Sequence, residues 1–410
     1  MARRSLQLQS TCVEVAKAAL KDSRYKTQIR LAIEAEIQAQ STVSSFFCGK
    51  PVERANFTKL CQLVNLDPIK VGKEPAPALK VDAATILATT KFARTEEEQW
   101  CQKLLELQAV VRIQAPSQFG KTTLMWKMLD RAEQQGHVAL YLDLNAIELS
   151  SFKDIQTFYR RFICEIISEI ETQYHPDCLI LLEQYDRPTI QRTPSAAFLK
   201  YLEQLQQKIV KPLTIGINKL DRLLDFPETG DEFLYQLRNM HENSKKPKAW
   251  QNFRLLLAYS TPRIEEFVTV VANRSPFNVG SLIQLGEFSS DEIARLAAMR
   301  GLKLDRSQIN TLMQSIGGIP SLVYLTLDQL REQGSDLAII APIYQDHLES
   351  LEFWLQDRDL YLLMQQIATN ASGVAITRKQ RSLLHRQGLI SSTNNQIQVR
   401  CELYRQFFAR

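Results

Sequence analysis

Gly120, Lys121 and Thr122 stand next to one another, shortly after an apolar run that ends at Ile113. A strand, a loop and a helix start in this order predict a phosphate-binding loop, because backbone N–H groups and the helix N-terminus point at the anion. Lys121 is expected to reach the β and γ phosphates, and the Thr122 hydroxyl to bind Mg²⁺. The residues predicted to bind nucleotide are Ala115, Pro116, Ser117, Gln118, Phe119, Gly120, Lys121, Thr122 and Thr123.

The carboxylates that a magnesium-dependent ATPase uses are missing where a strand predicted over 213–217 ends, because Asn218 and Lys219 occupy their positions. Asn218 carries no charge, and Lys219 is protonated near neutral pH and cannot act as a general base. Loss of a placed base slows chemistry by roughly 10²–10⁴-fold. We therefore expect ATP or ADP to bind, with weak or absent Mg²⁺ and impaired or absent hydrolysis. The alternative is a working ATPase that uses another acid, Asp221 or Asp143.

The elements that must position these residues indicate an α/β fold, a parallel sheet covered by helices on both faces. Ala115 replaces the first glycine of the phosphate motif, so the prediction depends on this strand–loop–helix context. An apolar run over 178–183 also ends in an acid, as the metal-binding strand of an ATPase would. It precedes the amphipathic stretch 196–209 and is therefore interpreted as a helix or connector rather than as that strand. The predicted strands are 109–113, 138–142, 213–217 and 254–259, and the predicted helices next to the loop are 95–107 and 122–131.

The N-terminal residues predict a small all-α domain with helix-turn-helix spacing. Its helices are expected from residue 6 to about 21 and over 25–36, 41–47 and 53–64. In the third helix Val43, Phe46 and Phe47 share the face that packs on the core. The other face is small and polar, which fits either duplex DNA or a partner protein. The candidate DNA-binding residues are Gln40, Ser41, Thr42, Ser44, Ser45, Lys50 and Arg54.

The net charge of +5 lies entirely in the N-terminal residues. Residues 1–72 contain 11 Lys and Arg against six Asp and Glu, so the remainder of the chain is neutral. A basic module on a neutral body suggests a polyanionic partner for that module. A solvated basic face explains the charge alone equally well.

At 410 residues the chain is expected to fold into two to four domains. Its composition, 45% hydrophobic and 23% charged, is typical of a globular protein. It shows neither a membrane-spanning run nor a secretory signal, which predicts a cytoplasmic protein without a membrane partner. The seven cysteines are scattered without zinc spacing and are interpreted as reduced thiols.

The C-terminal third is predicted to be a helical lid followed by a second small domain. Helices are expected over 290–335, and the tail over 358–410 has the order helix, helix, hairpin, helix that is typical of a winged helix. The hairpin is expected to turn at Asn394-Asn395. The predicted boundaries are 1–71 for the helix-turn-helix domain, 72–94 for a Pro-rich linker, 95–288 for the P-loop NTPase domain, 289–340 for the lid and 341–410 for the winged helix.

These motifs, in this order, resemble the bacterial AAA-like ATPase domain proteins of the STAND type that carry an N-terminal helix-turn-helix. The resemblance rests on the segments 111–122, 141–144, 221–224, 233–238, 275–280, 317–322 and 400–405. It implies that Pro320 of Gly318-Ile319-Pro320 packs on the adenine and couples the nucleotide to the lid. The alternative is that Gly317 and Gly318 only end a helix before Pro320. Candidates for a sensor or arginine finger are Ser260, Arg263 and Arg274.

Three functions from different classes follow. The first is a nucleotide-dependent regulatory switch that exposes or hides the N-terminal module and forms an oligomer on activation. The second is an active ATPase with a non-standard acid. The third is a DNA-binding regulator or scaffold that works without nucleotide. Arg378, Lys379, Arg381 and Arg386 of the tail are interpreted as packing residues rather than as DNA contacts, because the body of the chain is neutral.

Overall fold

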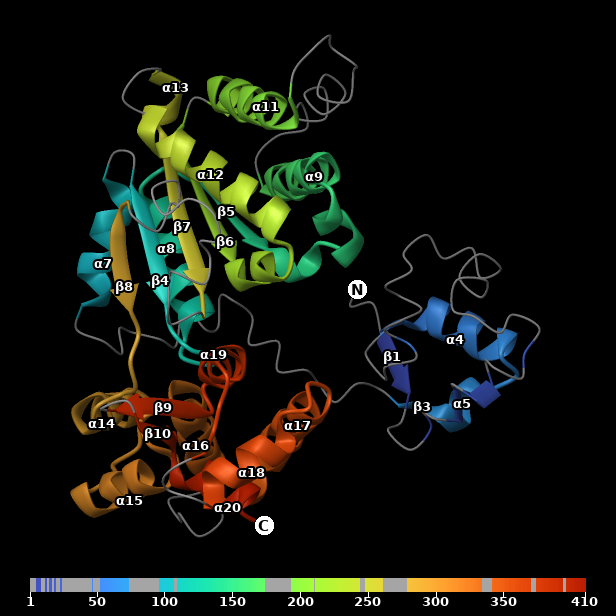
Figure 1. Cartoon of the computed structure of the whole chain (residues 1–410), viewed down its shortest axis with the longest axis vertical. Helices are drawn as coiled ribbons and strands as arrows, with labels where there is room; N and C mark the ends of the chain where they lie inside the picture. Colours follow the sequence, from blue (N-terminus) through green and yellow to red (C-terminus); the bar gives the residue numbers. More distant parts are fainter. Residues whose placement is uncertain are drawn as a thin grey trace. The chain divides into compact units, whose positions relative to one another are not determined.

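The computed structural model consists of two compact units, residues 1–86 and 87–410 (Figure 1). No helix among the described residues has the length and apolar composition needed to cross a membrane. The 178–183 segment and most of the predicted helix over 41–47 lie outside the described residues. The structure describes residues 5–8, 12, 15, 16, 18, 19, 23, 46, 52–73, 96–106, 109–173, 193–209, 211–243, 248–260, 279–333, 341–369, 374–393 and 396–410.

The described part of the first unit includes a small antiparallel sheet and the helices α4 and α5. Strand β1 (Ser5–Leu8) pairs on one side with β2 (Val52–Glu53) and on the other with β3 (Gly72–Lys73), the first two residues of the segment interpreted as a linker. Helices α4 (Arg54–Leu63) and α5 (Pro68–Val71) follow β2. The buried hydrophobic residues are Leu8, Ala16, Phe46, Val52, Phe57, Leu60, Cys61, Val64 and Val71.

The prediction that this unit is entirely α-helical is wrong. Residues 5–8 form a strand because polar and apolar residues alternate in Ser-Leu-Gln-Leu, which is the period of a half-buried strand. The helix predicted over 53–64 is confirmed as α4. Phe46, which we assigned to the packed face of the third helix, is fully buried and meets Phe57 edge to face at 5.2 Å. Helix α4 and the short strands β1 and β2 therefore contribute side chains to one hydrophobic core.

The second unit contains a five-stranded parallel sheet with the order β5-β6-β7-β4-β8. All four strands predicted from the sequence are confirmed, and β8 extends the sheet beyond β4. Because β6 and β7 lie between β5 and β4, the carboxyl ends of β5, β6 and β7 line up beside the phosphate loop. The strands are β4 (Val110–Gln114), β5 (Val138–Asp143), β6 (Leu213–Asn218), β7 (Phe253–Tyr259) and β8 (Ser281–Gln284).

Helices cover both faces of this sheet, as predicted. Helices α7 and α8 lie on one face and α9, α11 and α12 on the other (Figure 1). The two faces alternate along β4: Val111 and Ile113 join the core on the α8 side, and Val110 joins the core on the α9 side. The helices are α7 (Glu97–Leu105), α8 (Lys121–Gln134), α9 (Ile155–Gln173), α11 (Pro194–Ile209), α12 (Pro227–Asn243) and α13 (Lys248–Gln251), with 3-10 turns η2 (Leu144–Ala146), η3 (Leu149–Lys153) and η5 (Leu220–Asp225).

The lid and tail follow β8 in the predicted order. Ser289 caps the first lid helix, since its side chain accepts from the Glu292 amide. The tail hairpin pairs antiparallel, and its turn residues 394–395 lie outside the described residues. The elements are α14 (Ser290–Met299), α15 (Arg306–Ile316), α16 (Pro320–Gln333), η9 (Ala341–Tyr344), α17 (Gln345–Gln356), α18 (Tyr361–Thr369), α19 (Arg378–Gln387), β9 (Ile390–Thr393), β10 (Gln396–Val399) and α20 (Glu402–Phe408).

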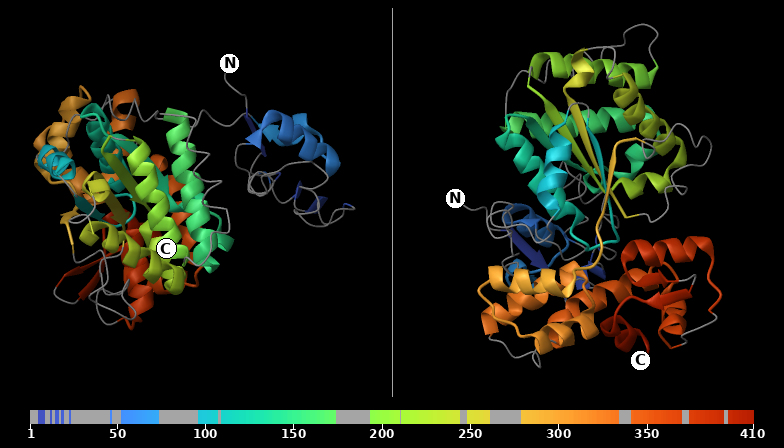
Figure 2. Two further views of the ribbon diagram at one scale, coloured as in Figure 1. Left: turned by 90° about the horizontal axis from the view of Figure 1, so that it is seen from above. Right: turned by 90° about the vertical axis from the view of Figure 1, so that its left-hand side faces the viewer.

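One hydrophobic core joins the sheet to the lid and the tail. It runs from Ile113 and Phe119 near the phosphate loop through Val323 of α16 to Met364 and Phe408 of the tail. In the right-hand view of Figure 2 the lid (orange) and tail (red) lie together on one side of the α/β part. The phosphate loop therefore lies where all three parts of this unit meet.

Candidate nucleotide-binding site

Two residues of the loop between β4 and α8 have left-handed backbone. They are Gly120, with φ +85°, and Gln118, with φ +69°. Glycine adopts this conformation freely, whereas a residue with a side chain loses roughly 1–2 kcal/mol. The first residues of α16 hold Gln118 in place, because the Ser321 N–H donates to its carbonyl at 3.2 Å and the Ser321 hydroxyl to its Oε1 at 3.0 Å. The lid thus supports the strained part of the loop.

Helix α8 begins at Lys121 with no side-chain cap, because Gly120 occupies the capping position. The first N–H groups of a helix have no partner within it, and the positive end of the helix dipole favours an anion there. Thr122 and Thr123 lie in this first turn. The residues from 115 to 123 are therefore arranged as a phosphate cradle requires.

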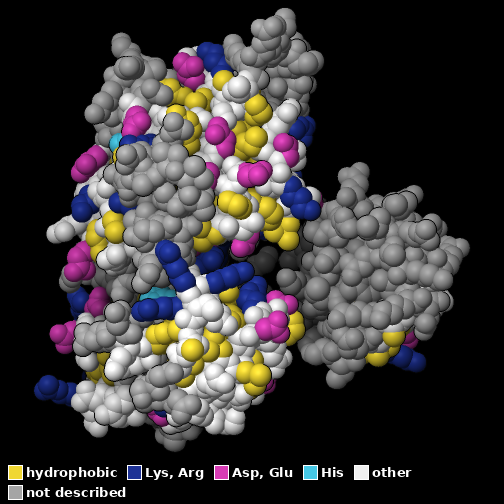
Figure 3. Space-filling view, viewed as in Figure 1, with side chains coloured by type: hydrophobic (Ala, Val, Ile, Leu, Met, Phe, Trp, Pro, Cys, Tyr) yellow, Lys and Arg dark blue, Asp and Glu magenta, His cyan; other side chains and the backbone are white. Residues whose placement is uncertain are grey.

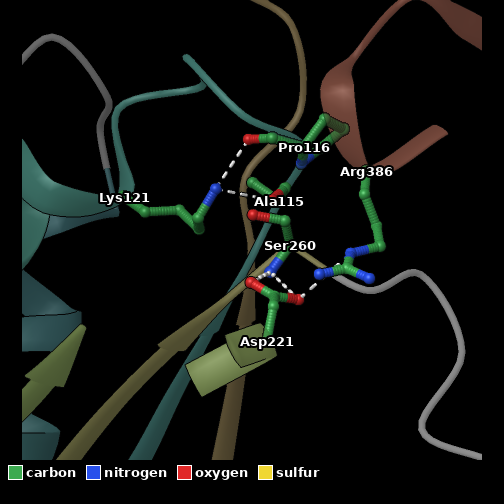
Figure 4. Close-up of polar contacts among 6 residues, drawn as sticks. All are labelled: Ala115, Pro116, Lys121, Asp221, Ser260 and Arg386. Atoms are coloured by element: carbon green, nitrogen blue, oxygen red, sulfur yellow. Dashed lines mark hydrogen bonds and ion pairs between the residues drawn. The ribbon is translucent and has the colours of Figure 1, made fainter. Parts of the chain in front are cut away.

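The Lys121 ammonium points back at its own loop (Figure 4). It donates to the carbonyl oxygens of Ala115 at 2.8 Å and Pro116 at 2.7 Å, and the side chain is 6% exposed. Burial lowers the pKa of Lys121 from 10.5 to about 7, an effect that Asp221 opposes and Lys219 reinforces. A phosphate that entered the cradle would take over these hydrogen bonds and favour the charged form.

Nucleotide affinity is accordingly expected to fall as the pH rises above 7. With a pKa of about 7, Lys121 loses its proton in the ligand-free protein, and an anion must then bind together with a proton. Affinity should weaken by up to about tenfold per pH unit above that pKa. The charge of the nucleotide itself is constant between about pH 7.5 and 9, since its last phosphate pKa is near 6. Calorimetric titrations across this window test the expectation, and a constant affinity would contradict it.

Asn218, at the end of β6, connects the helix to the neighbouring strand. Its side chain is 1% exposed, and its Nδ2 lies 3.3 Å from the Thr122 hydroxyl, 2.8 Å from the Tyr141 hydroxyl and 3.3 Å from Oδ2 of Asp143. The Tyr141 hydroxyl donates to the same Asp143 oxygen at 3.3 Å. Burial raises the pKa of Tyr141 to about 12, so this hydroxyl keeps its proton. The carboxyl ends of β5 and β6 therefore meet directly beside Thr122.

Lys219 and Asp221 follow at the same edge of the sheet. Lys219 has a left-handed backbone, with φ +59°, and directly precedes the turn η5. The Asp221 carboxylate accepts the Ser260 amide with both oxygens, at 2.8 and 2.7 Å, and its Oδ1 lies 3.7 Å from Nε of Arg386 (Figure 4). Ser260 and Asp221 are both 6% exposed. Asp221, proposed as a replacement acid, is thus engaged in holding β7 and the tail.

The tail packs directly on the phosphate loop. The Ser117 amide donates to the carbonyl oxygen of Arg386 at 2.7 Å. Gly388 ends α19 with φ +84°, and a Cβ added there would lie 3.3 Å from the Ser117 oxygen. The Arg400 guanidinium lies over the Phe119 ring, 5.1 Å from its centroid. These contacts come from a segment more than 260 residues away in the sequence, and nothing in its spacing signals them.

Pro320 is buried at the first position of α16. It directly precedes Ser321, the residue that donates hydrogen bonds to Gln118 of the phosphate loop. Gly317 ends the preceding helix α15. Both interpretations of the glycine–proline motif fit this position. Arg263 and Arg274 lie outside the described residues. The side chains predicted to bind DNA also lie outside the part of the chain that the structure describes. These are the side chains of Gln40, Ser41, Thr42, Ser44, Ser45, Lys50 and Arg54.

Helix α19, whose last residues contact the phosphate loop, is basic. Helix α19 carries Arg378, Lys379, Arg381 and Arg386 and no acidic residue. Lys and Arg side chains gather on this face where α19 lies (Figure 3). A concentration of positive charge beside a phosphate cradle attracts polyanions and speeds their association.

The chain is similar to several solved structures. A Walker-type ATPase of Pyrococcus abyssi is 13% identical, with a TM-score of 0.55, and the match covers 77% of this chain and 95% of that one. An ORC2 protein of Aeropyrum pernix, in ADPNP–ADP complexes, is 13% identical with a TM-score of 0.47, over 78% of this chain and 94% of that one. AMPPCP-bound DnaA from Aquifex aeolicus is 12% identical with a TM-score of 0.40, over 73% and 79%.

At such low identity the likeness to the Pyrococcus protein shows the fold alone, that of a P-loop ATPase. No curated protein matches the chain. The family model of the AAA-like domain matches residues 87–410, which are the whole second unit. The chain therefore belongs to the AAA-like domain family.

Proposed function

We propose that this chain is a STAND-type regulatory switch that binds ATP or ADP and hydrolyses ATP slowly or not at all. The carrying observation is the hydrogen bond from the Ser117 amide to the Arg386 carbonyl. Backbone amides of this loop are the groups that bind phosphate, so a phosphate and the tail compete for the same donor. Nucleotide state and tail position are thereby coupled.

The strand end beside the loop supports slow hydrolysis. Asn218 contributes no negative charge. Lys219 occupies the position where an ATPase has its general base, and a protonated lysine cannot act as one. Asp221 is held by the Ser260 amide and lies beside the Arg386 guanidinium, so it has no free position next to an attacking water. Nucleotide binding needs the loop amides and Lys121, which the chain supplies, whereas rapid hydrolysis needs a base as well.

The coupling between nucleotide and tail is of modest size, as a switch requires. One hydrogen bond, such as that from the Ser117 amide to the Arg386 carbonyl, contributes about 0.5–1.5 kcal/mol. Contacts of this size can be made and broken by a ligand that prefers one state. In this proposal the tail is a winged helix that closes the site when it is docked on the phosphate loop.

Calorimetric titration of the full chain with ADP and with ATP, alongside a phosphate-release assay, tests the proposal. Both nucleotides should bind, and phosphate release should stay near the rate of the buffer. No heat from either nucleotide would end the proposal. Steady phosphate release that disappears in Lys121→Ala would instead establish the working ATPase.

For the N-terminal unit we propose duplex DNA as the partner, with a protein as the competing candidate. If Lys50 and Arg54 contact phosphates, replacing both by alanine should make the slope of log affinity against log salt shallower by about 2. Fluorescence anisotropy with a labelled duplex at several salt concentrations measures this slope. Lys70→Ala, exposed on α5, is the control. Unchanged affinity and slope in the double variant would remove this unit as a DNA reader and favour the protein partner.

A further inference from the structure

We infer that Gln118 of the phosphate loop and His347 of α17 form a proton-sensitive latch, which holds the tail on the loop while the His347 ring is neutral. The inference rests on the proposed function, and it deepens it by naming mild acid as a condition that releases the tail. Helix α17 packs on α18, and His347 bonds to Tyr404 of α20, so this histidine belongs to the body that packs on the loop. The two latch residues are 229 positions apart in the sequence, so they meet only while that body is docked.

The Gln118 side chain connects the loop to both the lid and the tail. Its Oε1 accepts from the Ser321 hydroxyl at 3.0 Å, and its Nε2 lies 3.4 Å from Nδ1 of His347. Its left-handed backbone, with φ +69°, costs roughly 1–2 kcal/mol that a glycine would avoid. Such a conformation persists only where the surroundings hold it, and a glycine would lose both side-chain contacts. The strained residue is thus the one that reaches both other parts of the unit.

The Gln118 amide requires a neutral His347 ring. Because the amide nitrogen is a donor, Nδ1 of His347 has to accept, and the ring proton lies on Nε2, which donates to the Tyr404 hydroxyl at 2.9 Å. A second proton would place an N–H group at Nδ1, opposite the N–H₂ group of Gln118. Protonation therefore removes this hydrogen bond unless the amide turns over, and turning requires the Ser321 hydroxyl to change from donor to acceptor.

The surroundings of the His347 ring do not compensate for a positive charge. Its two hydrogen-bond partners, Gln118 and Tyr404, are uncharged, and burial raises the pKa of Tyr404, which keeps its proton. Burial lowers the pKa of His347, and no described charged side chain contributes to the change. The charged residues on the loop, on α17 and on or next to α20 are Lys121, Asp346, Glu349, Arg400, Glu402 and Arg405.

The docked tail therefore binds fewer protons than the released tail. On release, water reaches the ring and the pKa of His347 returns toward its ordinary value of 6.5. A neutral His347 supports docking fully above this pH. As the pH falls below it, docking weakens until the lowered pKa of the docked state is passed. Each pH unit within this window changes the docking equilibrium by up to about tenfold.

Protection of the Ser117 amide measures docking directly, because this N–H donates to the Arg386 carbonyl at the end of α19. Hydrogen exchange of the nucleotide-free full chain is followed from about pH 5 to about pH 8, and the intrinsic exchange rate is divided out. His347→Asn is the matched variant, since its side-chain oxygen can accept from Gln118 and does not titrate in this range.

The ratio of Ser117 protection in the unaltered chain to that in His347→Asn should be constant above about pH 6.5 and should fall by up to about tenfold per pH unit below it. Lys121 and His385 remain in both proteins, so their titration cancels in this ratio. A ratio that stays constant over the whole range would overturn the latch.

ADP titration of the same two proteins at the alkaline end of this range separates the latch from the proposed function. Absence of ADP binding would overturn the proposed function whatever the exchange ratio does, whereas ADP binding together with a constant ratio would overturn the latch alone. Matching thermal unfolding of the two proteins shows that the variant is folded, and His347→Gln takes its place if it is not.

Discussion

Replacing Lys121 with alanine is expected to weaken ADP and ATP binding by at least about 100-fold. Hydrogen bonds to charged groups contribute about 1.5–3 kcal/mol each, and the ammonium can give more than one to the phosphates. Two such bonds correspond to a loss of about 100-fold or more. Because Lys121 now donates to Ala115 and Pro116, the loop is already shaped around its ammonium. Calorimetry with each nucleotide measures the loss.

Lys208→Ala is the control for this experiment, because Lys208 is exposed in the last turn of α11 and its loss removes the same charge. It should bind nucleotide as the unaltered chain does. An affinity of Lys121→Ala within about threefold of the control, with both proteins folded, contradicts a phosphate role for this lysine.

Replacing Gly388 with leucine is expected to separate the tail from the phosphate loop. Gly388 has a φ of +84°, and a Cβ there would lie 3.3 Å from the Ser117 oxygen and 3.5 Å from the Phe119 ring. The larger side chain has to enter the loop or displace α19. We expect hydrogen exchange of the Ser117 amide to rise about tenfold, since loss of a bond to Arg386 of about 1.4 kcal/mol has that effect. Nucleotide affinity should rise by several-fold, because the amide becomes available to phosphate.

Gly301→Leu controls for backbone strain in this prediction. Gly301 also has a left-handed backbone, with φ +76°, but a Cβ there meets nothing within 4 Å. Both substitutions force a side chain into the left-handed region, which costs about 1–2 kcal/mol. Equal exchange at Ser117 in the two variants would mean that the tail does not control the loop.

Much of the second unit is predictable from the sequence, because its strands are strongly periodic. The run over 109–113 is apolar enough for a strand buried on both faces, and Gly120-Lys121-Thr122 follows at the spacing of a phosphate loop. The family model covers this unit and confirms the AAA-like part of the resemblance. The order of the strands in the sheet cannot be predicted from these local patterns, because it depends on which strands pair with one another in the folded chain.

The candidate site is less predictable than the fold. Asn218 and Lys219 can be placed because they follow a recognisable strand. Arg386 cannot, because its contact with Asp221 arises only when the tail folds back on the sheet. The proximity of Asp143 to Asn218 depends on the register between two strands that lie far apart in the sequence. Local patterns carry no information on such distant pairs.

In the N-terminal unit the prediction failed for a local element, the strand β1. Its helix α4 was predictable from the apolar spacing around Phe57 and Leu60, yet β1 was not, because four residues of alternating pattern also fit the start of an amphipathic helix. Short strands have too few residues to distinguish the two periods, and the sheet forms from segments nearly 70 residues apart.

The most direct test of the central claim, that nucleotide and tail compete for the phosphate loop, is hydrogen exchange of the full chain with and without saturating ADP. Exchange in the peptide covering 115–123 should slow when ADP binds, while exchange around His385 to Leu389 at the end of α19 should accelerate. Protection of the loop without any change in α19 would contradict the account, because nucleotide would then occupy the cradle while the tail stayed docked.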